Sequence, residues 1–140
     1  MRILGIDLGE KKIGLAISDE LGITAQGLPT ILSSTEQENL ARIKEIVERY
    51  RVVQIVLGLP RNMNGTLGKE AEKAMSFAKN LNNLCRIPVE LEDERLSTAA
   101  AEKFLIAVDR SRKKRKKVID KMSAVLILQS YLDRRMMSNG

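Results

Sequence analysis

Two short apolar runs, separated by only four residues, most constrain how this chain can fold: RILGIDL (2–8) and IGLAIS (13–18). Both runs contain β-branched residues, and the polar segment between them has the length of a tight turn, so the pair predicts a β-hairpin. If those four residues form the turn, Asp7 lies opposite Gly14. Small residues then line the face that carries Asp7, and apolar residues line the other. The hairpin therefore predicts open space above the Asp7 carboxylate.

The rest of the chain alternates strand-like apolar runs with segments whose apolar residues recur at helical spacing. The expected strands cover 28–32, 52–60 and 88–92; the expected helices cover 40–50, 71–84 and 118–132, with a further helix that DERLS (93–97) opens and that runs through Leu105. Because Pro29 lies inside the third run, that strand is expected at an edge of the sheet. This order predicts an α/β fold with a mixed five-stranded sheet, its first three strands antiparallel, flanked by helices. A length of 140 residues predicts a single domain over 1–140.

The sequence contains no histidine and one cysteine, Cys85. The lack of histidine excludes Ser-His and Cys-His catalysis and the common zinc sites that use histidine. One cysteine cannot form an internal disulfide, so the expected compartment is the cytoplasm. The apolar runs are too short to span a bilayer and the first residues do not predict a signal peptide, so we expect no membrane association. Catalysis would have to use carboxylates, hydroxyls, lysine, arginine or a metal bound through oxygen.

The basic residues are concentrated in RSRKKRKK (110–117), which we call the basic segment. The chain has a formal net charge of +6, and without the seven basic residues of this segment 17 basic residues face 18 acidic ones. We expect a loop that contacts a polyanion, although a merely solvated loop remains the alternative. A membrane surface fits less well because no apolar face accompanies the charges. The expected phosphate contacts are Arg110, Arg112, Lys113, Lys114, Arg115, Lys116 and Lys117.

Two acidic residues stand out near the ends of apolar elements. Asp7 lies near the end of the first strand, where desolvation is costly unless the carboxylate is paired or binds a cation. The alternative is an exposed acid bonded to Lys11 or Lys12. Asp120 lies early in the last helix, where it favours the helix dipole, and its face continues through the apolar Ala124. The Asp120 side chain is therefore expected to point toward the sheet.

DERLS adds two more acids directly after the fifth strand. Asp93 has a structural explanation, because it can cap the following helix or pair with Arg95. Glu94 is less easily explained, since Ser97 is a better helix cap. Arg95 can pair with Asp93 or contact phosphate, and the sequence does not decide between the two.

Asp7, Glu94 and Asp120 come from two strand ends and one helix start, which can share one end of an open sheet. Three carboxylates in one cleft repel one another unless divalent cations neutralise them. Oxygen ligands without histidine favour Mg²⁺ or Mn²⁺. With a basic segment just before Asp120, the sequence predicts metal-assisted phosphodiester hydrolysis, with these three residues as catalytic groups and metal ligands.

Four blocks of the sequence together resemble the YqgF/RuvX family: GIDLGEKKIGLAISD (5–19), VLGLPRNMNG (56–65), DERLSTAAAE (93–102) and KKVIDKMSAVLILQSYL (116–132). That family is described as Holliday-junction resolvases or pre-16S rRNA nucleases, and the resemblance implies an RNase H-like fold. It also places the acids of the family at the same three positions. In resolvases of the RuvC type an acid lies at the end of the fourth strand, where this chain has Gly58-Leu59-Pro60.

The resemblance favours a nuclease that matures the 5′ end of the 16S rRNA precursor, with resolution of branched DNA as the alternative. A four-way junction has two-fold symmetry and would favour a dimer, but the sequence does not indicate the oligomeric state. GIDLG also resembles the phosphate loop of actin-type ATPases, which need two such domains. A non-catalytic RNA-binding ribosome-assembly factor is a further alternative. With 3% aromatic residues, such a factor would bind mainly through backbone contacts.

Overall fold

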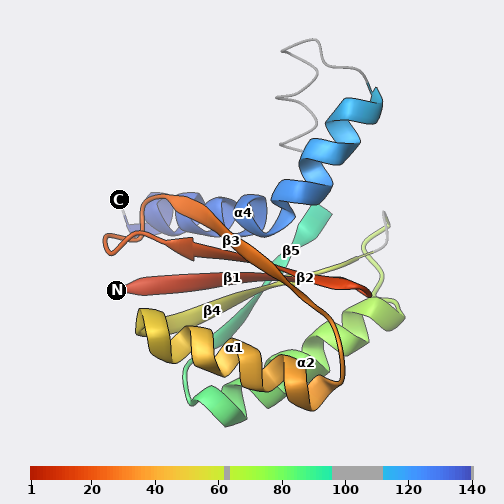
Figure 1. Cartoon of the computed structure of the whole chain (residues 1–140). Coiled ribbons are helices and arrows are strands. Elements are labelled where there is room, and N and C mark those ends of the chain that lie inside the picture. The colour runs from red at the N-terminus through yellow and green to blue at the C-terminus, as the bar shows by residue number, and fades with distance from the viewer. Residues whose placement is uncertain (62–63, 96–111, 140) are drawn as a thin grey trace.

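The computed structural model describes residues 1–61, 64–95 and 112–139, and within the last range it describes the side chains of 122–137. Its centre is a five-stranded sheet in the order β3-β2-β1-β4-β5 (Figure 1). The strands are β1 (Arg2–Leu8), β2 (Lys12–Ser18), β3 (Ala25–Leu32), β4 (Val52–Leu59) and β5 (Val89–Asp93). β1, β2 and β3 pair antiparallel, and β1, β4 and β5 pair parallel. The mixed sheet expected from the sequence is confirmed.

The N-terminal hairpin has the predicted register. Asp7 lies opposite Gly14, and the backbone N–H of Gly9 donates to the carbonyl of Lys12 at 3.0 Å across the turn. The third strand is an edge strand, as the proline at position 29 indicated, and it begins earlier than expected, at Ala25. Short turns and the two-residue period of strands therefore decide this half of the sheet locally.

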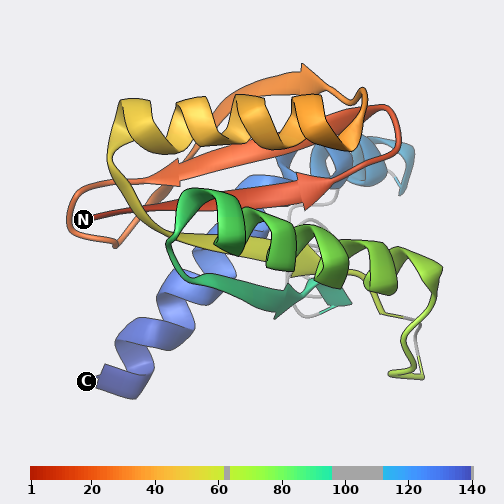
Figure 2. The same ribbon diagram turned by 90° about the horizontal axis from the view of Figure 1, so that it is seen from below.

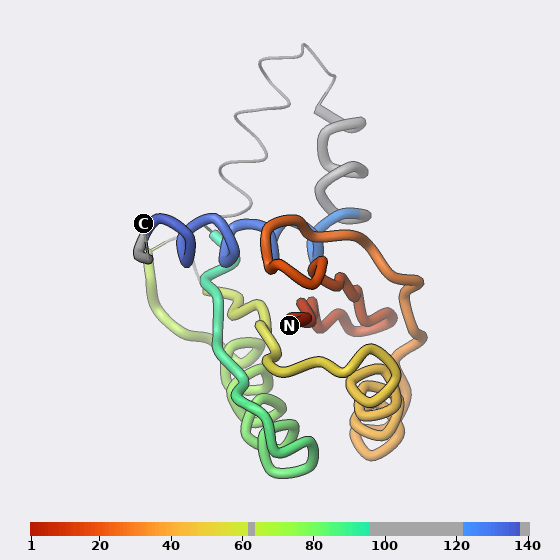
Figure 3. Tube along the Cα trace, turned by 90° about the vertical axis from the view of Figure 1, so that its left-hand side faces the viewer, coloured from red at the N-terminus to blue at the C-terminus, as the bar shows by residue number. Residues whose placement is uncertain are grey.

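Helices α1 (Glu36–Tyr50) and α2 (Lys69–Cys85) cover one face of the sheet, and α4 (Arg112–Asn139) crosses the other (Figures 1, 2 and 3). The Thr35 hydroxyl accepts a hydrogen bond from the backbone N–H of Glu38 at 3.2 Å and so caps the first turn of α1. In the part of the chain that the structure describes, no helix is both long and apolar enough to cross a bilayer.

The two faces of the hairpin enter two different cores. Leu4, Ile6, Leu15 and Ile17 pack with α1 and α2. The face that carries Asp7 packs against α4, with Ile3, Ala16, Val56, Ala124, Ile127, Leu128 and Leu132 buried. The space predicted above that face receives α4. A Cβ at Gly5 would lie 2.7 Å from the Leu128 Cβ, too close for any larger residue. Ala124 lets the helix approach closely, as expected.

The prediction that the basic segment is a loop is wrong for Arg112–Lys117, because α4 already begins at Arg112. Lysine and arginine are good helix formers, and this stretch contains no glycine or proline. Arg110 and the helix expected through Leu105 lie outside the described residues. The last helix extends beyond the predicted Leu132 to Asn139.

Candidate active site

The site begins at the ends of β1 and β5, where Asp7 and Glu94 lie. β1, β4 and β5 are parallel, so their carboxyl ends meet at one edge of the sheet. Asp7 is the next-to-last residue of β1, and Glu94 directly follows the last residue of β5. Their side chains are hydrogen-bonded to each other. The expectation that these two acids share one end of the sheet is confirmed.

Gly58 in β4 makes room for the Glu94 carboxyl. β4 lies between β1 and β5, and a Cβ at position 58 would overlap Glu94 Oε1 and lie 2.7 Å from Ile127 Cδ1. Only a residue without a side chain leaves that volume to Glu94. From the sequence, Gly58 is notable only as a position without an acid. The alternation of residues along this strand does not indicate that a carboxyl from another part of the chain occupies the space beside Gly58.

The surroundings of Glu94 raise its pKa to about 8. Burial is the largest cause, followed by the hydrogen bond and the charge repulsion from Asp7, and then the charge of Asp93. At neutral pH the Glu94 carboxyl therefore carries a proton. A cation that binds between the two carboxyls would displace this proton.

Ser123 in α4 joins the pair by donating a hydrogen bond from its hydroxyl to Asp7 Oδ2. It orients the Asp7 carboxyl from the helix side. Sequence reasoning missed Ser123, although it lies one helical turn after Asp120, whose face was expected to meet the sheet.

Asp120 lies in α4, one turn before Ser123, but its side chain is outside the described part. Its role as third acid remains a prediction. Among the side chains that the structure describes, no group of three metal-binding residues occurs. The described acids of the site are the pair Asp7 and Glu94.

Asp93 is the last residue of β5 and is bound to arginine. Its Oδ1 accepts from the Arg95 backbone N–H at 3.0 Å, and its Oδ2 accepts from Arg95 Nη2 at 2.7 Å. Arg61 Nε is 3.8 Å from Oδ2. The hydrogen bonds from the Arg95 guanidinium are the largest cause of a lowered Asp93 pKa. The structural explanation of Asp93 is thus the one observed.

The other predicted nucleic-acid contacts are less fully described. Arg95 pairs with Asp93, and its contact with phosphate stays a prediction. Arg112–Lys117 form the first turns of α4, without described side chains, and Arg110 is outside the described residues.

The described donors fit a hard divalent cation. Two carboxyls share a hydrogen bond here, and burial together with the neighbouring acid raises the pKa of Glu94. Carboxylate and hydroxyl oxygens are the ligands that Mg²⁺ and Mn²⁺ prefer.

Comparison with known proteins adds a family and a fold. The model of the family RuvX, described as Holliday junction resolvase, matches residues 1–134. A protein of Bacillus pumilus (strain SAFR-032) is 60% identical over 135 residues, covering 95% of this chain and 98% of the relative. One of Bacillus cereus (strain B4264) is 57% identical over 137 residues, covering 96% and 100%. Both are named "Putative pre-16S rRNA nuclease".

Among solved structures, Thermus thermophilus RuvC in complex with Holliday junction substrate superimposes with a TM-score of 0.64 at 18% identity, covering 97% of this chain and 96% of that one. The fowlpox virus Holliday junction resolvase gives 0.51 at 16% identity, covering 96% and 99%. At such identities the likeness concerns the fold alone. The expected RNase H-like fold is confirmed.

Proposed function

This chain belongs to the RuvX family of Holliday junction resolvases, and from that premise we propose that it is a divalent-metal-dependent nuclease that matures the 5′ end of the 16S rRNA precursor. The observation that carries the proposal is the direct contact between Asp7 and Glu94 at the carboxyl edge of the sheet. Two acids that share a hydrogen bond at the carboxyl edge of a parallel sheet, with the pKa of one of them raised, are suited to binding a cation.

In this proposal Asp7, Glu94 and Asp120 hold Mg²⁺ or Mn²⁺, which when bound activates water and stabilises the leaving oxygen of a phosphodiester. The chain's own residues prepare the site. The Ser123 hydroxyl fixes one oxygen of Asp7. The hollow above Gly58 places the Glu94 carboxyl beside Asp7, and Glu94 must release its proton to act as a ligand.

The RNA substrate is supported by the relatives, which are 57–60% identical over nearly the whole chain and bear an rRNA-nuclease name. Resolution of branched DNA is the second candidate, favoured by the description of the family. Arg95 and the basic segment supply the phosphate contacts in either case. Position 58 carries glycine in this chain, so the site is built without an acid on β4.

The test is cleavage of purified 16S rRNA precursor and of a synthetic four-way DNA junction, side by side, with Mg²⁺ or Mn²⁺. We expect cleavage of the precursor and its loss in Asp7→Asn, Glu94→Gln and Asp120→Asn, each still folded and able to bind nucleic acid. Cleavage of the junction alone would select the second candidate. If the variants and the wild type support ribosome maturation equally without cleaving either substrate, the protein is a binding factor and the proposal fails.

A further inference from the structure

A second charged cluster lies next to the acid pair, on the opposite side of the end of β5. The Asp93 carboxylate receives two guanidinium groups from different parts of the chain, Arg95 just after β5 and Arg61 just after β4. Two described cations contact one anion here, whereas two acids meet at the neighbouring site.

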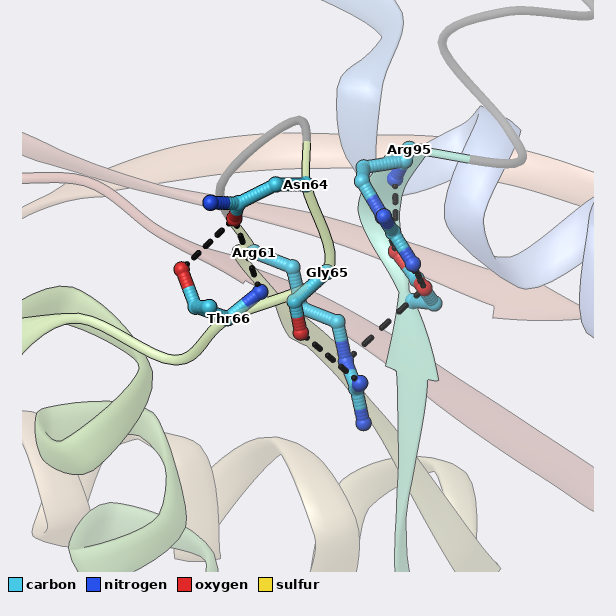
Figure 4. A network of polar contacts seen from close by, with 6 residues as sticks. Arg61, Asn64, Gly65, Thr66 and Arg95 are labelled. Atoms are coloured by element: carbon cyan, nitrogen blue, oxygen red, sulfur yellow. Dashed lines mark hydrogen bonds and ion pairs between the residues drawn. The ribbon is translucent and has the colours of Figure 1, made fainter.

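The loop between β4 and α2 holds Arg61 in place (Figure 4). Arg61 Nη1 donates to the carbonyl of Gly65 at 3.4 Å, while its Nε faces Asp93. Gly65 has a positive φ of 88°, and Asn64 Oδ1 beside it accepts from the Thr66 backbone N–H at 3.1 Å and from the Thr66 hydroxyl at 2.7 Å. The described part of the loop is therefore ordered by its own hydrogen bonds, and the guanidinium is directed toward Asp93 in the absence of a ligand.

The two guanidinium groups remain accessible. The side chains of Arg61 and Arg95 are 36% and 33% exposed, whereas that of Asp93 is 20% exposed. A guanidinium has five N–H donors in a planar fork that suits phosphate. Among the described residues no hydrogen bond reaches Nη2 of Arg61, so this end of the fork can still bind an anion.

We propose that Arg61 and Arg95, bridged by Asp93, form a subsite for a backbone phosphate beside the one that is cleaved. The adjacency of Asp93 and Glu94 places the subsite and the acid pair on the two sides of one strand end. Asp93 is a positioning residue that holds both arginines on the side of β5 opposite the acid pair. The inference rests on the proposed function for the identity of its ligand, a nucleic-acid strand.

The test measures binding rather than cleavage, with the full chain in EDTA. The probes are a fluorescein-labelled RNA duplex and a labelled four-way DNA junction, and affinity is measured over a series of KCl concentrations. For Arg61→Gln we expect binding weaker by about tenfold at low salt, because a charge-assisted hydrogen bond is lost. The slope of log affinity against log salt should fall by about 0.9, the value for one phosphate contact on duplex DNA.

Arg49→Gln is the matched control. Arg49 lies in the last turn of α1, at the start of β4 and so at the opposite end of the sheet, and it is exposed. This variant should keep the wild-type slope. Arg61→Lys keeps the charge without the fork, so it should restore most of the slope and only part of the affinity.

Wild-type affinity and slope in Arg61→Gln would overturn the subsite, as would equal losses in Arg61→Gln and Arg49→Gln. If Arg61 only ties the loop to β5, its removal would lower the melting temperature and leave the slope unchanged, which also overturns the proposal. Failure of the proposed nuclease function looks different: the chain would bind both probes with the predicted slopes and cleave no substrate when metal is added.

Discussion

The two sides of the end of β5 treat neighbouring acids in opposite ways. Asp93 faces two arginines, and its pKa is lowered, first by the hydrogen bonds from Arg95. Glu94 faces Asp7 beneath α4, and its pKa is raised to about 8, first by burial. The difference teaches that the pKa of neighbouring acids depends on what each one faces: arginine lowers the pKa of Asp93, and burial beside a second acid raises that of Glu94.

Glu92 is a third case, because it lies on the same side of β5 as Glu94 but is paired with an arginine. It is 1% exposed, and its Oε2 accepts from Arg134 Nη2 of α4 at 2.5 Å. Its Oε1 has no partner among the described residues, and burial raises its pKa. It is less accessible to solvent than Glu94, and its ion pair with Arg134 ties α4 to the sheet. We therefore assign Glu92 to the fold and not to the site.

The largest expected effect separates the two neighbouring acids. Glu94→Gln should reduce cleavage by more than about 100-fold, since even the outer partners of metal ligands cost 10–100-fold. In metal-free buffer it should raise the melting temperature, because one of two acids in contact is removed. Asp93→Asn should keep more activity and lower stability by about 1–2 kcal/mol through the lost charged hydrogen bonds. Cleavage rates and thermal melts measure both; an inactive Asp93→Asn beside an active Glu94→Gln would reverse the assignment.

Gly58→Ala tests whether the hollow on β4 positions Glu94. The new Cβ would overlap Glu94 Oε1 and crowd Ile127, so we expect a loss of about 1–3 kcal/mol from overpacking and lower cleavage per folded molecule. Gly27→Ala is the control, because its Cβ would meet only Val125 Cγ2 at an ordinary 3.5 Å. Chemical denaturation and cleavage assays are the measurements. Equal behaviour of the two variants would remove the role given to Gly58.

The pH dependence of stability tests the raised pKa of Glu94. The folded state holds the proton up to about pH 8, whereas the unfolded state releases it near the ordinary value of 4.5. Stability in metal-free buffer should therefore fall as the pH rises through this window, because the folded state binds the extra proton. Relative to Glu94→Gln the fall should be on the order of 1–2 kcal/mol after allowing for solvent screening. Stabilisation by added Mg²⁺ should grow over the same window, and parallel curves for both proteins would contradict the assignment.

The smallest effect concerns Glu92, the compensated acid. Arg134→Met should cost about 1 kcal/mol, a modest loss because Arg134 is 52% exposed and Glu92 can take up a proton. Cleavage per folded molecule should stay at the wild-type level. Arg49→Met, at an exposed position, should leave stability unchanged. Urea denaturation of the two variants measures the stability difference. A large loss of cleavage in Arg134→Met would show that Glu92 belongs to the site.

The sequence by itself determined the hairpin, its register and the position of Asp7 opposite Gly14. Strand period and turn length act over a few residues, so they can be read without knowing the rest of the fold. The edge strand followed from Pro29 for the same local reason. The placement of Asp7 and Glu94 at one end of the sheet followed from strand direction. For the basic segment, the expectation of a loop gave the charge more weight than the helix propensity of lysine and arginine. The propensity prevails from Arg112.

Only the tertiary structure decided what surrounds those acids. Gly58 matters because β4 lies between β1 and β5, and Ser123 matters because α4 crosses the hairpin face above Asp7. Arg61 meets Asp93 because β4 and β5, which are far apart in sequence, pair in parallel and end at the same edge of the sheet. Sequence patterns record which residues share a face of one element. They do not record which elements pack together, and the electrostatics of Asp93 and Glu94 depend on that packing.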